Sequence, residues 1–294
     1  MAASPPLPNG RASPFSSDRV PRYSRGMNPI RLNPPRQLLL AGGTIFSSSI
    51  RLPEPGLCEL LGYAGFDFVL LDCEHGAADA ATLDVLVQGC YAGNTVPVVR
   101  VLRNDEPEAM MRALDLGVQG VLIPHCRSAE DARRLWKATR YPPDGNRGYG
   151  PGRGCQWGRV PTAEYLQSAA DQVLTIALVE DPEGVDRIVE IARAGLDLLW
   201  VGTSDLACAF GLAGQPGHPR VIEAALHILQ TCQQAGVACG FPARDADSAI
   251  WARDQGFRAI GYGCAEQYIM QASRQFLDRL GARGGGSDSQ ALGR

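Results

Sequence analysis

The chain has 294 residues, a formal net charge of −3 and a hydrophobic fraction of 45 %, and this length allows one large domain or two small ones. Of its 28 basic residues only Lys137 is a lysine, and we expect it on the surface of a charged helical stretch. Schiff-base enzymes, pyridoxal-phosphate enzymes and P-loop nucleotidases each need a lysine at the reacting centre, so the composition disfavours these classes.

Cysteine usage and charge distribution bear on compartment and partners. The nine cysteines include no CxxC pair, so we interpret them as small buried hydrophobic residues of a cytoplasmic protein. No apolar run reaches the ~18 residues of a membrane span, and we expect no membrane partner. Residues 1–36 hold six arginines and one aspartate, a net +5, and the remainder carries −8. Because the body of the chain is acidic, we expect no nucleic-acid partner.

The two ends of the chain differ in composition from the middle. Residues 1–36 are rich in Pro, Ser and Arg, which predicts a disordered extension. A transit peptide is one alternative, which the prolines disfavour, and a start mis-assigned upstream of Met27 is another. Residues 281–294 are glycine-rich and predict a flexible tail. Residues 37–280 are expected to form a single domain.

Between these ends, short apolar runs alternate with amphipathic stretches of helical period. Such runs are typical of buried parallel strands, and eight are predicted: Leu38–Ala41, Phe66–Asp72, Val96–Val101, Gly120–His125, Thr175–Glu180, Leu198–Gly202, Ala238–Pro242 and Ala259–Gly263. Eight strand–helix units over roughly 245 residues predict an α/β fold of the TIM (β/α)8 barrel type, which has about 250 residues. A doubly wound sheet is the alternative, but no GxGxxG follows the first predicted strand.

One connection, from Tyr141 to Asp171, is unusually long for a loop in a compact domain. Loops of this length are commonly lids or binding loops, so we expect it to contribute to binding. A phosphate-binding interpretation of its many glycines is weak, because neither a helix start nor a lysine follows them.

Polar residues recur where four of the predicted strands end. These positions are Asp72-Cys-Glu-His75, Arg100, Glu180 and Gly202-Thr-Ser-Asp205. Because the carboxyl ends of barrel strands open at one mouth, we expect these side chains to converge there.

Glu180 and Asp205 follow neighbouring predicted strands and offer only hard oxygen ligands. Two carboxylates, completed by water and substrate oxygens, suit Mg²⁺, Mn²⁺ or a related octahedral ion. The alternative is a helix cap for Asp205 and a surface position for Glu180. Neither strand end carries a histidine, which disfavours a tetrahedral zinc site.

His75 and Arg100 complete the predicted site. Asp72 could orient His75 and raise its basicity, which makes His75 a candidate general base, although a lone histidine is more often structural. His125 also stands at a strand end. Arg100 would be an unpaired cation at the top of a buried strand, and beside a carboxylate–metal pair it could stabilise a developing enolate.

At these residues the sequence resembles the HpcH/HpaI aldolase family of the phosphoenolpyruvate/pyruvate barrel superfamily. The resemblance covers about residues 38–275 and rests on the order and spacing of five segments: Gly65-Phe-Asp-Phe-Val-Leu-Leu-Asp-Cys-Glu-His75, Val98-Val-Arg-Val, Leu114-Asp-Leu-Gly-Val-Gln-Gly-Val, Tyr141-Pro-Pro-Asp-Gly-Asn-Arg-Gly and Gly202-Thr-Ser-Asp-Leu206. It implies a class II aldolase that cleaves a 4-hydroxy-2-oxo acid of the 2-keto-3-deoxy sugar acid type to pyruvate and an aldehyde. It also implies a homo-oligomer, commonly a hexamer of barrels with exchanged terminal helices.

The resemblance further implies a role for each matching residue. Glu180 and Asp205 match the carboxylates that hold a divalent metal, Mg²⁺, Mn²⁺ or Co²⁺, which the pyruvate unit chelates. Arg100 would stabilise the enolate oxygen, and His75 would act as base through water. Asp115 matches an aspartate that assists the histidine, and its position after a helix implies action across a subunit interface. Ser204 matches a position whose backbone amide holds the substrate carboxylate.

Two departures from the family pattern bear on the substrate. Leu178 stands where the family has a glutamine that faces the substrate, and Gly202-Thr-Ser-Asp205 replaces Gly-Pro-x-Asp. Loss of an amide removes a hydrogen-bonding group from the pocket. A citrate synthase of siderophore biosynthesis, which joins acetyl-CoA to oxaloacetate on this scaffold, therefore remains an alternative. A third possibility is a barrel kept as a binding module, since fold alone does not fix function.

Overall fold

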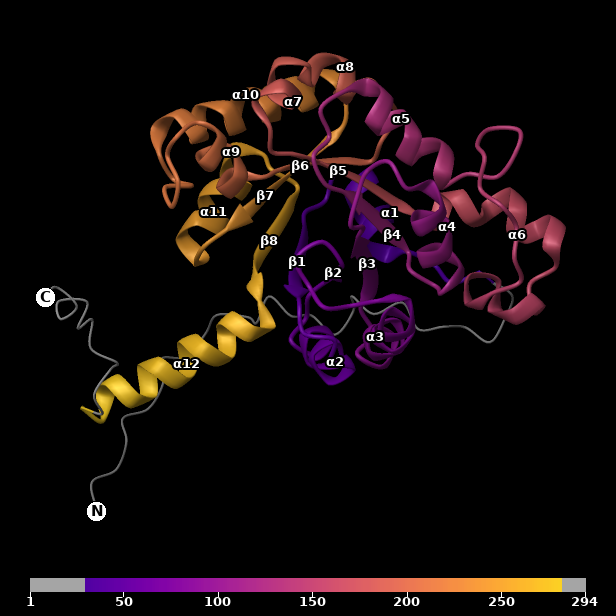
Figure 1. Ribbon diagram of the computed structural model, residues 1–294, viewed down its shortest axis with the longest axis horizontal. Coiled ribbons are helices and arrows are strands. Elements are labelled where there is room, and N and C mark those ends of the chain that lie inside the picture. The colour runs from indigo at the N-terminus through magenta and orange to yellow at the C-terminus, as the bar shows by residue number, and fades with distance from the viewer. Residues whose placement is uncertain (1–29, 282–294) are drawn as a thin grey trace, which may run out of the picture.

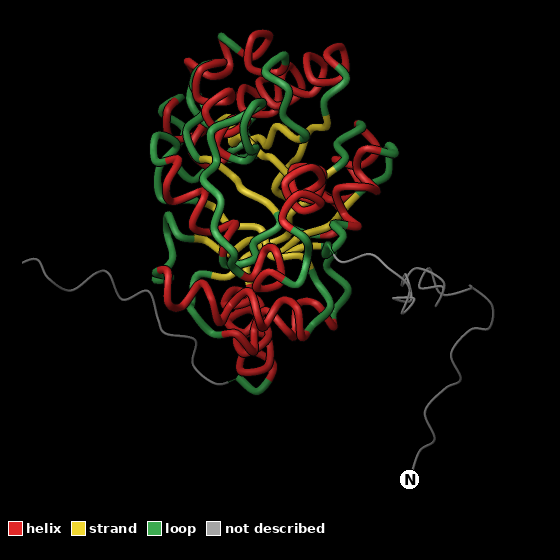
Figure 2. Tube along the Cα trace, turned by 90° about the vertical axis from the view of Figure 1, so that its right-hand side faces the viewer, coloured by secondary structure: helices red, strands yellow, loops and turns green. Residues whose placement is uncertain are grey.

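The computed structural model describes residues 30–281, and the predictions for residues 1–29 and 282–294 lie outside this range. Its eight parallel strands form a closed barrel in the order β1 to β8, surrounded by helices (Figures 1 and 2). The predicted TIM barrel is confirmed. The strands are β1 Ile45–Ile50, β2 Phe68–Asp72, β3 Val96–Arg100, β4 Gly120–Ile123, β5 Leu174–Val179, β6 Leu198–Val201, β7 Ala238–Ala243 and β8 Ala259–Cys264.

Twelve α-helices and two 3₁₀ segments connect the strands in the described part of the chain. The α-helices are α1 Pro34–Leu40, α2 Pro55–Tyr63, α3 Ala80–Ala92, α4 Pro107–Asp115, α5 Ala129–Ala138, α6 Thr162–Ser168, α7 Pro182–Asp186, α8 Ile188–Ala192, α9 Thr203–Ala209, α10 Pro219–Ala235, α11 Ala246–Gln255 and α12 Ala265–Arg279. The 3₁₀ segments are η2 Arg153–Gly158 and η3 Ala169–Gln172. Within residues 30–281 no helix is both long and apolar enough to cross a membrane.

Two apolar layers hold the barrel together. The larger lies between the strands and the surrounding helices, and the smaller fills the barrel interior around Phe68, Ile176 and Trp200. The Trp200 indole fits closely against two glycines: an added Cβ would lie 2.5 Å from it at Gly240 and 2.7 Å from it at Gly261. A close-packed interior of this kind tolerates little change in side-chain volume, so Trp200 forms a fixed lower wall for the open end of the barrel.

The first predicted strand is wrong. Leu38–Ala41 lies in and just after helix α1, and the first strand is Ile45–Ile50. The Asn33 side chain accepts a hydrogen bond from the Arg36 amide, and Pro34 stands at the helix start, so the local signal is a capped helix. The apolar pattern did not predict strand β1, because the polar side chains of Ser47-Ser48-Ser49 at its centre interrupt the apolar run.

Residues 30–36 are also ordered, against the expectation that they belong to a disordered extension. Ile30 and Asn33 are buried, and the Asn33 amide donates to the Gln119 carbonyl at 2.7 Å. The Arg36 guanidinium donates two hydrogen bonds to the Asp197 carboxylate, at 2.8 and 3.0 Å. These contacts place α1 across the amino ends of the strands, which closes the base of the barrel.

The long connection, expected to be a lid or a binding loop, lies at the base as well. It follows the last turn of α5 and packs around the end of α4, where Gly152 comes so close that an added Cβ would lie 2.5 Å from the Asp115 carbonyl. Its own small core contains Tyr141, Cys155 and Tyr165. It therefore does not cover the mouth of its own barrel.

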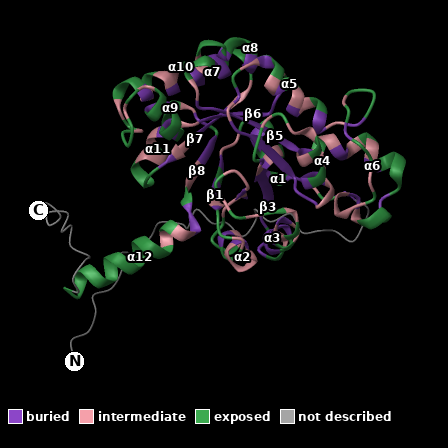
Figure 3. Ribbon diagram, in the orientation of Figure 1, coloured by how far each residue is buried: buried purple, intermediate pink, exposed green. Residues whose placement is uncertain are grey.

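Helix α12 extends away from the barrel, and most of it is exposed (Figures 1 and 3). Its exposed side chains include large apolar ones: Ile269, Met270, Phe276 and Leu277. Its first turn is anchored, because Glu266 Oε1 accepts hydrogen bonds from the amides of Arg51 and Leu52, at 2.8 and 2.7 Å.

Candidate functional site

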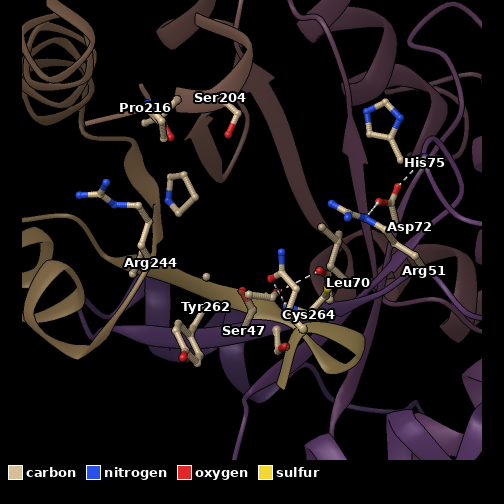
Figure 4. Close-up of a pocket in the computed structure, with 18 of the residues that line it drawn as sticks. Ser47, Arg51, Leu70, Asp72, His75, Ser204, Pro216, Arg244, Tyr262 and Cys264 are labelled. Atoms are coloured by element: carbon tan, nitrogen blue, oxygen red, sulfur yellow. Dashed lines mark hydrogen bonds and ion pairs between the residues drawn. The ribbon is translucent and has the colours of Figure 1, made fainter. Parts of the chain in front are cut away.

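A cavity of about 790 Å³ opens at the carboxyl ends of the strands. The predicted residues that line it are Asp72, His75, Arg100, Leu178, Glu180, Ser204 and Asp205. Figure 4 shows Ser204 on one side of this cavity, with Asp72 and His75 on another. The predicted convergence of polar strand ends is thus observed, and Asp115, which was expected away from the mouth of its own barrel, does not line the cavity.

Asp72 organises the loop that follows β2. Its Oδ1 accepts hydrogen bonds from the backbone amides of Glu74 and His75, both at 3.1 Å, and from Arg100 Nε at 2.9 Å. Arg100 Nη2 contacts Oδ2 at 2.5 Å. Burial alone would raise the pKa of Asp72, but the hydrogen bond and charge of Arg100 outweigh it, so the pKa is lowered. Asp72 is therefore an ionised anchor.

The sequence predicts that Asp72 orients the His75 ring, but in the structure Asp72 accepts a hydrogen bond from the His75 backbone. Asp72 holds the backbone of His75, and the carboxylate nearest to the ring is Glu74, with Oε2 at 3.7 Å from Nε2. The His75 side chain is 58 % exposed and lies at the cavity edge. It is accessible to water and to a substrate hydroxyl, as a general base needs to be.

Arg100 is the fixed cation of the site. Its side chain is only 12 % exposed, with Asp72 on one side and Glu74 Oε2 at 3.0 Å from Nη1 on the other. Burial opposes its charge, yet Asp72, Glu74 and Glu180 together raise its pKa. Three of the five guanidinium N–H groups reach these acids, which leaves two for a ligand.

Glu180 and Asp205 present carboxylates with unused acceptor capacity. Glu180 is buried just after β5, and the His125 amide donates to its Oε1 at 2.9 Å. Burial raises the pKa of Glu180 to about 7, and the charge of Asp205 adds to this. Gly202 makes room for it, because an added Cβ would lie 2.4 Å from Glu180 Cβ. Asp205 is exposed in the first turn of α9.

This donor set fits a hard divalent cation. Two adjacent carboxylates, one of them destabilised as an anion by burial and by the other, gain most from a positive ion between them. No group of three or more His, Cys, Asp or Glu residues within 30–281 is arranged to hold a metal. The remaining coordination positions would thus fall to water and substrate oxygens, the usual arrangement for Mg²⁺.

His125 and Glu74, which the sequence places at strand ends without a predicted role, contact the side chains of the site. His125 has φ +48°, uncommon outside glycine, and this backbone turn directs its amide to Glu180. Its Nδ1 lies 3.0 Å from Asp181 Oδ2, and its Nε2 lies 3.6 Å from Glu74 Oε1. Burial alone would lower the pKa of His125, but Asp181, Glu180 and Glu74 outweigh burial, so the pKa is raised above its ordinary value. The sequence could have indicated both residues, because each lies two positions after the end of a strand, Glu74 after β2 and His125 after β4.

Asp115 lies at the other end of the barrel. It ends α4, where Arg147 Nη2 donates to its Oδ1 at 2.8 Å, and it is absent from the cavity lining. The Arg147 side chain is 1 % exposed, whereas that of Asp115 is 27 % exposed. Asp115 is thus held at the base surface and cannot reach the mouth of its own subunit.

Leu178, on β5, and Ser204, in the helix α9 that follows the neighbouring strand β6, both line the cavity. Leu178 is buried and pairs in register with Trp200, so the wall at this point is apolar. Ser204 lies in the first turn of α9, where backbone amides lack intrahelical acceptors. An amide at that position can receive a carboxylate.

Two aldolases have similar sequences. The chain is 34 % identical over 253 residues to a hydroxypyruvate/pyruvate aldolase of Delftia acidovorans, a match that covers 85 % of this chain and 93 % of the relative. It is 33 % identical over 228 residues to a 4-hydroxy-2-oxo-heptane-1,7-dioate aldolase of Shigella sonnei, covering 76 % and 86 % of the two chains.

Solved structures of similar fold include members of the same family. The barrel is similar to an HpcH/HpaI aldolase/citrate lyase family protein of Burkholderia cenocepacia, with a TM-score of 0.80, 33 % identity and coverage of 84 % and 99 %. It is also similar to the citrate synthase SbnG, with a TM-score of 0.75, 26 % identity and coverage of 84 % and 98 %. The family model HpcH/HpaI aldolase/citrate lyase matches residues 50–272. The chain belongs to the HpcH/HpaI aldolase/citrate lyase family.

Proposed function

We propose that the protein is a metal-dependent carbon–carbon lyase that cleaves a 4-hydroxy-2-oxo acid to pyruvate and an aldehyde. The observation that carries the proposal is the buried Glu180 carboxylate beside Asp205 and Arg100, at the mouth of a barrel with no lysine in its cavity. Lys137 is exposed on α5, so an iminium cannot form in this cavity. The aldolase names of the relatives support the same reaction class.

Cleavage breaks the bond between C3 and C4 of the substrate. The proton of the C4 hydroxyl passes to a base, the hydroxyl oxygen becomes the aldehyde carbonyl, and the electron pair of the broken bond enters the enolate of pyruvate. A proton added at C3 then completes pyruvate. The site must therefore supply a base at C4 and positive charge at the C2 oxygen.

His75 and Arg100 are assigned these two tasks. His75 takes the hydroxyl proton, directly or through water, since its ring is exposed at the cavity edge. Arg100 directs its two remaining N–H groups at the developing enolate oxygen, and because Asp72 and Glu74 already fix the guanidinium, it needs little reorganisation. The Ser204 amide would hold the substrate carboxylate, and Leu178 would face the substrate as an apolar wall.

Glu180 and Asp205 would hold the divalent cation, Mg²⁺ or Mn²⁺, with Co²⁺ as a further candidate. When bound, the cation supplies a Lewis acid that withdraws electrons from the 2-oxo group. The test is pyruvate release from 4-hydroxy-2-oxo acids with and without chelator. Loss of activity in chelator and recovery with Mg²⁺ or Mn²⁺ is expected, and full activity in excess chelator would sink the proposal.

A second candidate is the citrate synthase reaction between oxaloacetate and acetyl-CoA. It is favoured by the likeness to SbnG and by the apolar Leu178, and opposed by the higher identity to the aldolases. Incubation with both substrates would release free thiol if this reaction occurs. Absence of thiol release under conditions that give pyruvate release would exclude it.

We also infer a cytoplasmic homo-oligomer, with six copies as the expectation. The exposed apolar side chains of α12 need a partner in water, and an exchanged terminal helix would provide one. In such an assembly Asp115, held at the base surface by Arg147, could approach the mouth of another subunit and assist its His75. Sedimentation of the wild type and of a Phe276→Ser variant on α12 tests this.

A further inference from the structure

The arginines that line the cavity fall into two kinds. Arg100 is buried and held by two acids. Arg51, just beyond β1, is half-exposed, and only its Nε reaches a carboxylate, Asp72 Oδ2 at 3.4 Å. Within residues 30–281 no acid pairs with the two Nη atoms of Arg51. Figure 4 shows the end of this side chain directed into the cavity, so its four Nη hydrogens are available to a ligand.

The backbone of Arg51 is fixed although its side-chain end is free. Its amide donates to Glu266 Oε1 at 2.8 Å, and its carbonyl accepts from the Ala77 amide at 3.1 Å. The first of these partners lies on α12 and the second on the loop after His75. A cation carried on a fixed backbone loses less entropy on binding than one on a mobile loop.

Arg244 stands across the cavity, beyond the end of β7 (Figure 4). Its side chain is exposed, and no acid within the described residues pairs with it. The guanidinium lies against the loop at Gly217, where an added Cβ would be 3.1 Å from Nη2. In the described part of the chain, the cavity therefore has a guanidinium with unpaired Nη atoms on two opposite sides.

The other charges of the cavity are accounted for. Arg100 and Arg51 face the two acids Asp72 and Glu74, and a divalent cation would match Glu180 with Asp205. Helix α12 contributes one charge of each sign, Arg274 and Asp278. What remains is the positive charge of Arg244 together with the unpaired Nη groups of Arg51, which favour a substrate with an anionic group beyond its 2-oxo carboxylate.

We propose that Arg51 and Arg244 form a subsite that selects an aldehyde carrying a carboxylate or phosphate group. This inference rests on the proposed function, because it assigns the end of the cavity that accepts the aldehyde product. Arg51 shares Asp72 with the loop that carries His75, so it lies on the side where the proposed base meets C4. The 2-oxo carboxylate has its own place at Ser204 and the metal, which leaves Arg51 and Arg244 for the second anion.

The kinetic test runs the reaction in the direction of condensation, with pyruvate and two matched pairs of aldehydes. Succinic semialdehyde is compared with butanal, and glyceraldehyde 3-phosphate with glyceraldehyde, so that carboxylate and phosphate are distinguished. We expect kcat/KM for at least one anionic aldehyde to exceed that of its neutral match at least tenfold. This ratio should fall at least tenfold in Arg51→Gln, less in Arg244→Gln, and be retained in part by Arg51→Lys.

The control is Arg253→Gln, which removes an equally exposed arginine on α11 that pairs only with its neighbour Asp254. It should leave the ratio unchanged. Raising the salt concentration should lower the ratio in the wild type, because exposed charges are screened. Equal turnover of anionic and neutral aldehydes by the wild type, or an equal ratio in Arg51→Gln, would overturn the proposal.

A binding measurement separates this inference from the proposed function. Calorimetry with Mg²⁺ compares 2-oxoglutarate with 2-oxopentanoate, which has the same chain length and lacks the second carboxylate. We expect at least tenfold tighter binding of the dianion, lost in Arg51→Gln. Preference for the dianion without any aldol turnover would refute the lyase and keep the anion subsite. Turnover without any preference would keep the lyase and refute the subsite.

Discussion

Carboxylates at the two ends of the barrel have different hydrogen-bond partners. At the base, Asp197 Oδ2 accepts from the Thr175 amide at 2.9 Å, from the Thr175 hydroxyl at 3.0 Å and from Arg36 Nε at 3.0 Å. Its Oδ1 accepts from Arg36 Nη2. At the mouth, Glu180 Oε1 accepts one hydrogen bond, from the His125 amide, and lies 3.5 Å from His125 Nδ1. No hydrogen bond or ion pair reaches the Asp205 carboxylate from the described residues.

The difference separates stability from function. A buried carboxylate whose lone pairs are filled by the fold holds elements together, and Asp197 joins α1 to β5. A buried carboxylate with empty lone pairs costs free energy until something binds it. Glu180 is such a group, and burial, the largest cause, raises its pKa to about 7. Within a TIM barrel this asymmetry points to the carboxyl ends of the strands as the site of chemistry.

Neutralising Glu180 should have the largest effect on activity of the changes at either end of the barrel. We expect Glu180→Gln to lower kcat/KM by roughly a thousandfold, equivalent to about 4 kcal/mol, because an amide is a poor ligand for the proposed cation. Its melting temperature should not fall, since burial no longer opposes a charge. Pyruvate release, a thermal melt and metal titration by calorimetry measure activity, stability and metal affinity. Wild-type metal affinity in this variant would refute the assignment of Glu180.

Arg100→Lys tests the fixed cation of the mouth. A lysine keeps the charge but cannot bridge Asp72 and Glu74 while still presenting N–H groups to a ligand. We expect kcat to fall roughly a hundredfold, close to the loss seen when one oxyanion donor is removed, with a smaller effect on KM. An unchanged kcat would show that Arg100 acts only on the loop after β2.

Asp197→Asn tests the base. It leaves Arg36, whose side chain is 13 % exposed, without its anion, and loss of one partner of a largely buried ion pair costs about 3 kcal/mol. We expect that decrease in unfolding free energy by urea titration, with kcat of the folded fraction unchanged. The double change Arg36→Met with Asp197→Asn should recover part of the stability. A variant as stable as the wild type would remove the proposed division between the two ends.

The pH dependence of metal binding sharpens the comparison further. Burial raises the pKa of Glu180 to about 7, so protons compete with metal below that pH, and affinity should fall about tenfold per unit as pH decreases. In the metal-free protein, stability changes with pH in the opposite direction to metal affinity. The folded state holds this proton more tightly than the unfolded chain, so stability falls as pH rises from 4.5 towards 7. Glu180→Gln should flatten both profiles.

The barrel and the approximate ends of seven strands followed from the sequence, because apolar runs such as Val96–Arg100 are buried on both faces. Strand β1 did not, since Ser47 and Ser49 face the cavity and not the core. Periodicity reports burial in apolar surroundings, so a strand that lines a polar cavity is hidden from it.

Contacts between side chains were the least predictable part of the site. The sequence placed Asp72 near His75, but it is the backbone amide of His75, and not its ring, that donates a hydrogen bond to Asp72. Glu74 and Arg51 gained their places only through the fold, Glu74 against Arg100 and Arg51 through the anchor at Glu266. Such partners depend on which way each side chain leaves the strand end, and the pattern of residue types does not carry that information.

The smallest expected effect belongs to Lys137, the single lysine. It is exposed in the last turn of α5, outside the cavity, so Lys137→Met should change kcat/KM and metal affinity less than twofold, with Lys137→Arg as the charge-matched control. Borohydride added during turnover should leave the wild type active and its mass unchanged, since an enolate formed without an iminium offers nothing to reduce. A reduced adduct on Lys137 would reverse the comparison: the chemistry would then lie outside the mouth, and the open carboxylates of Glu180 and Asp205 would need another explanation.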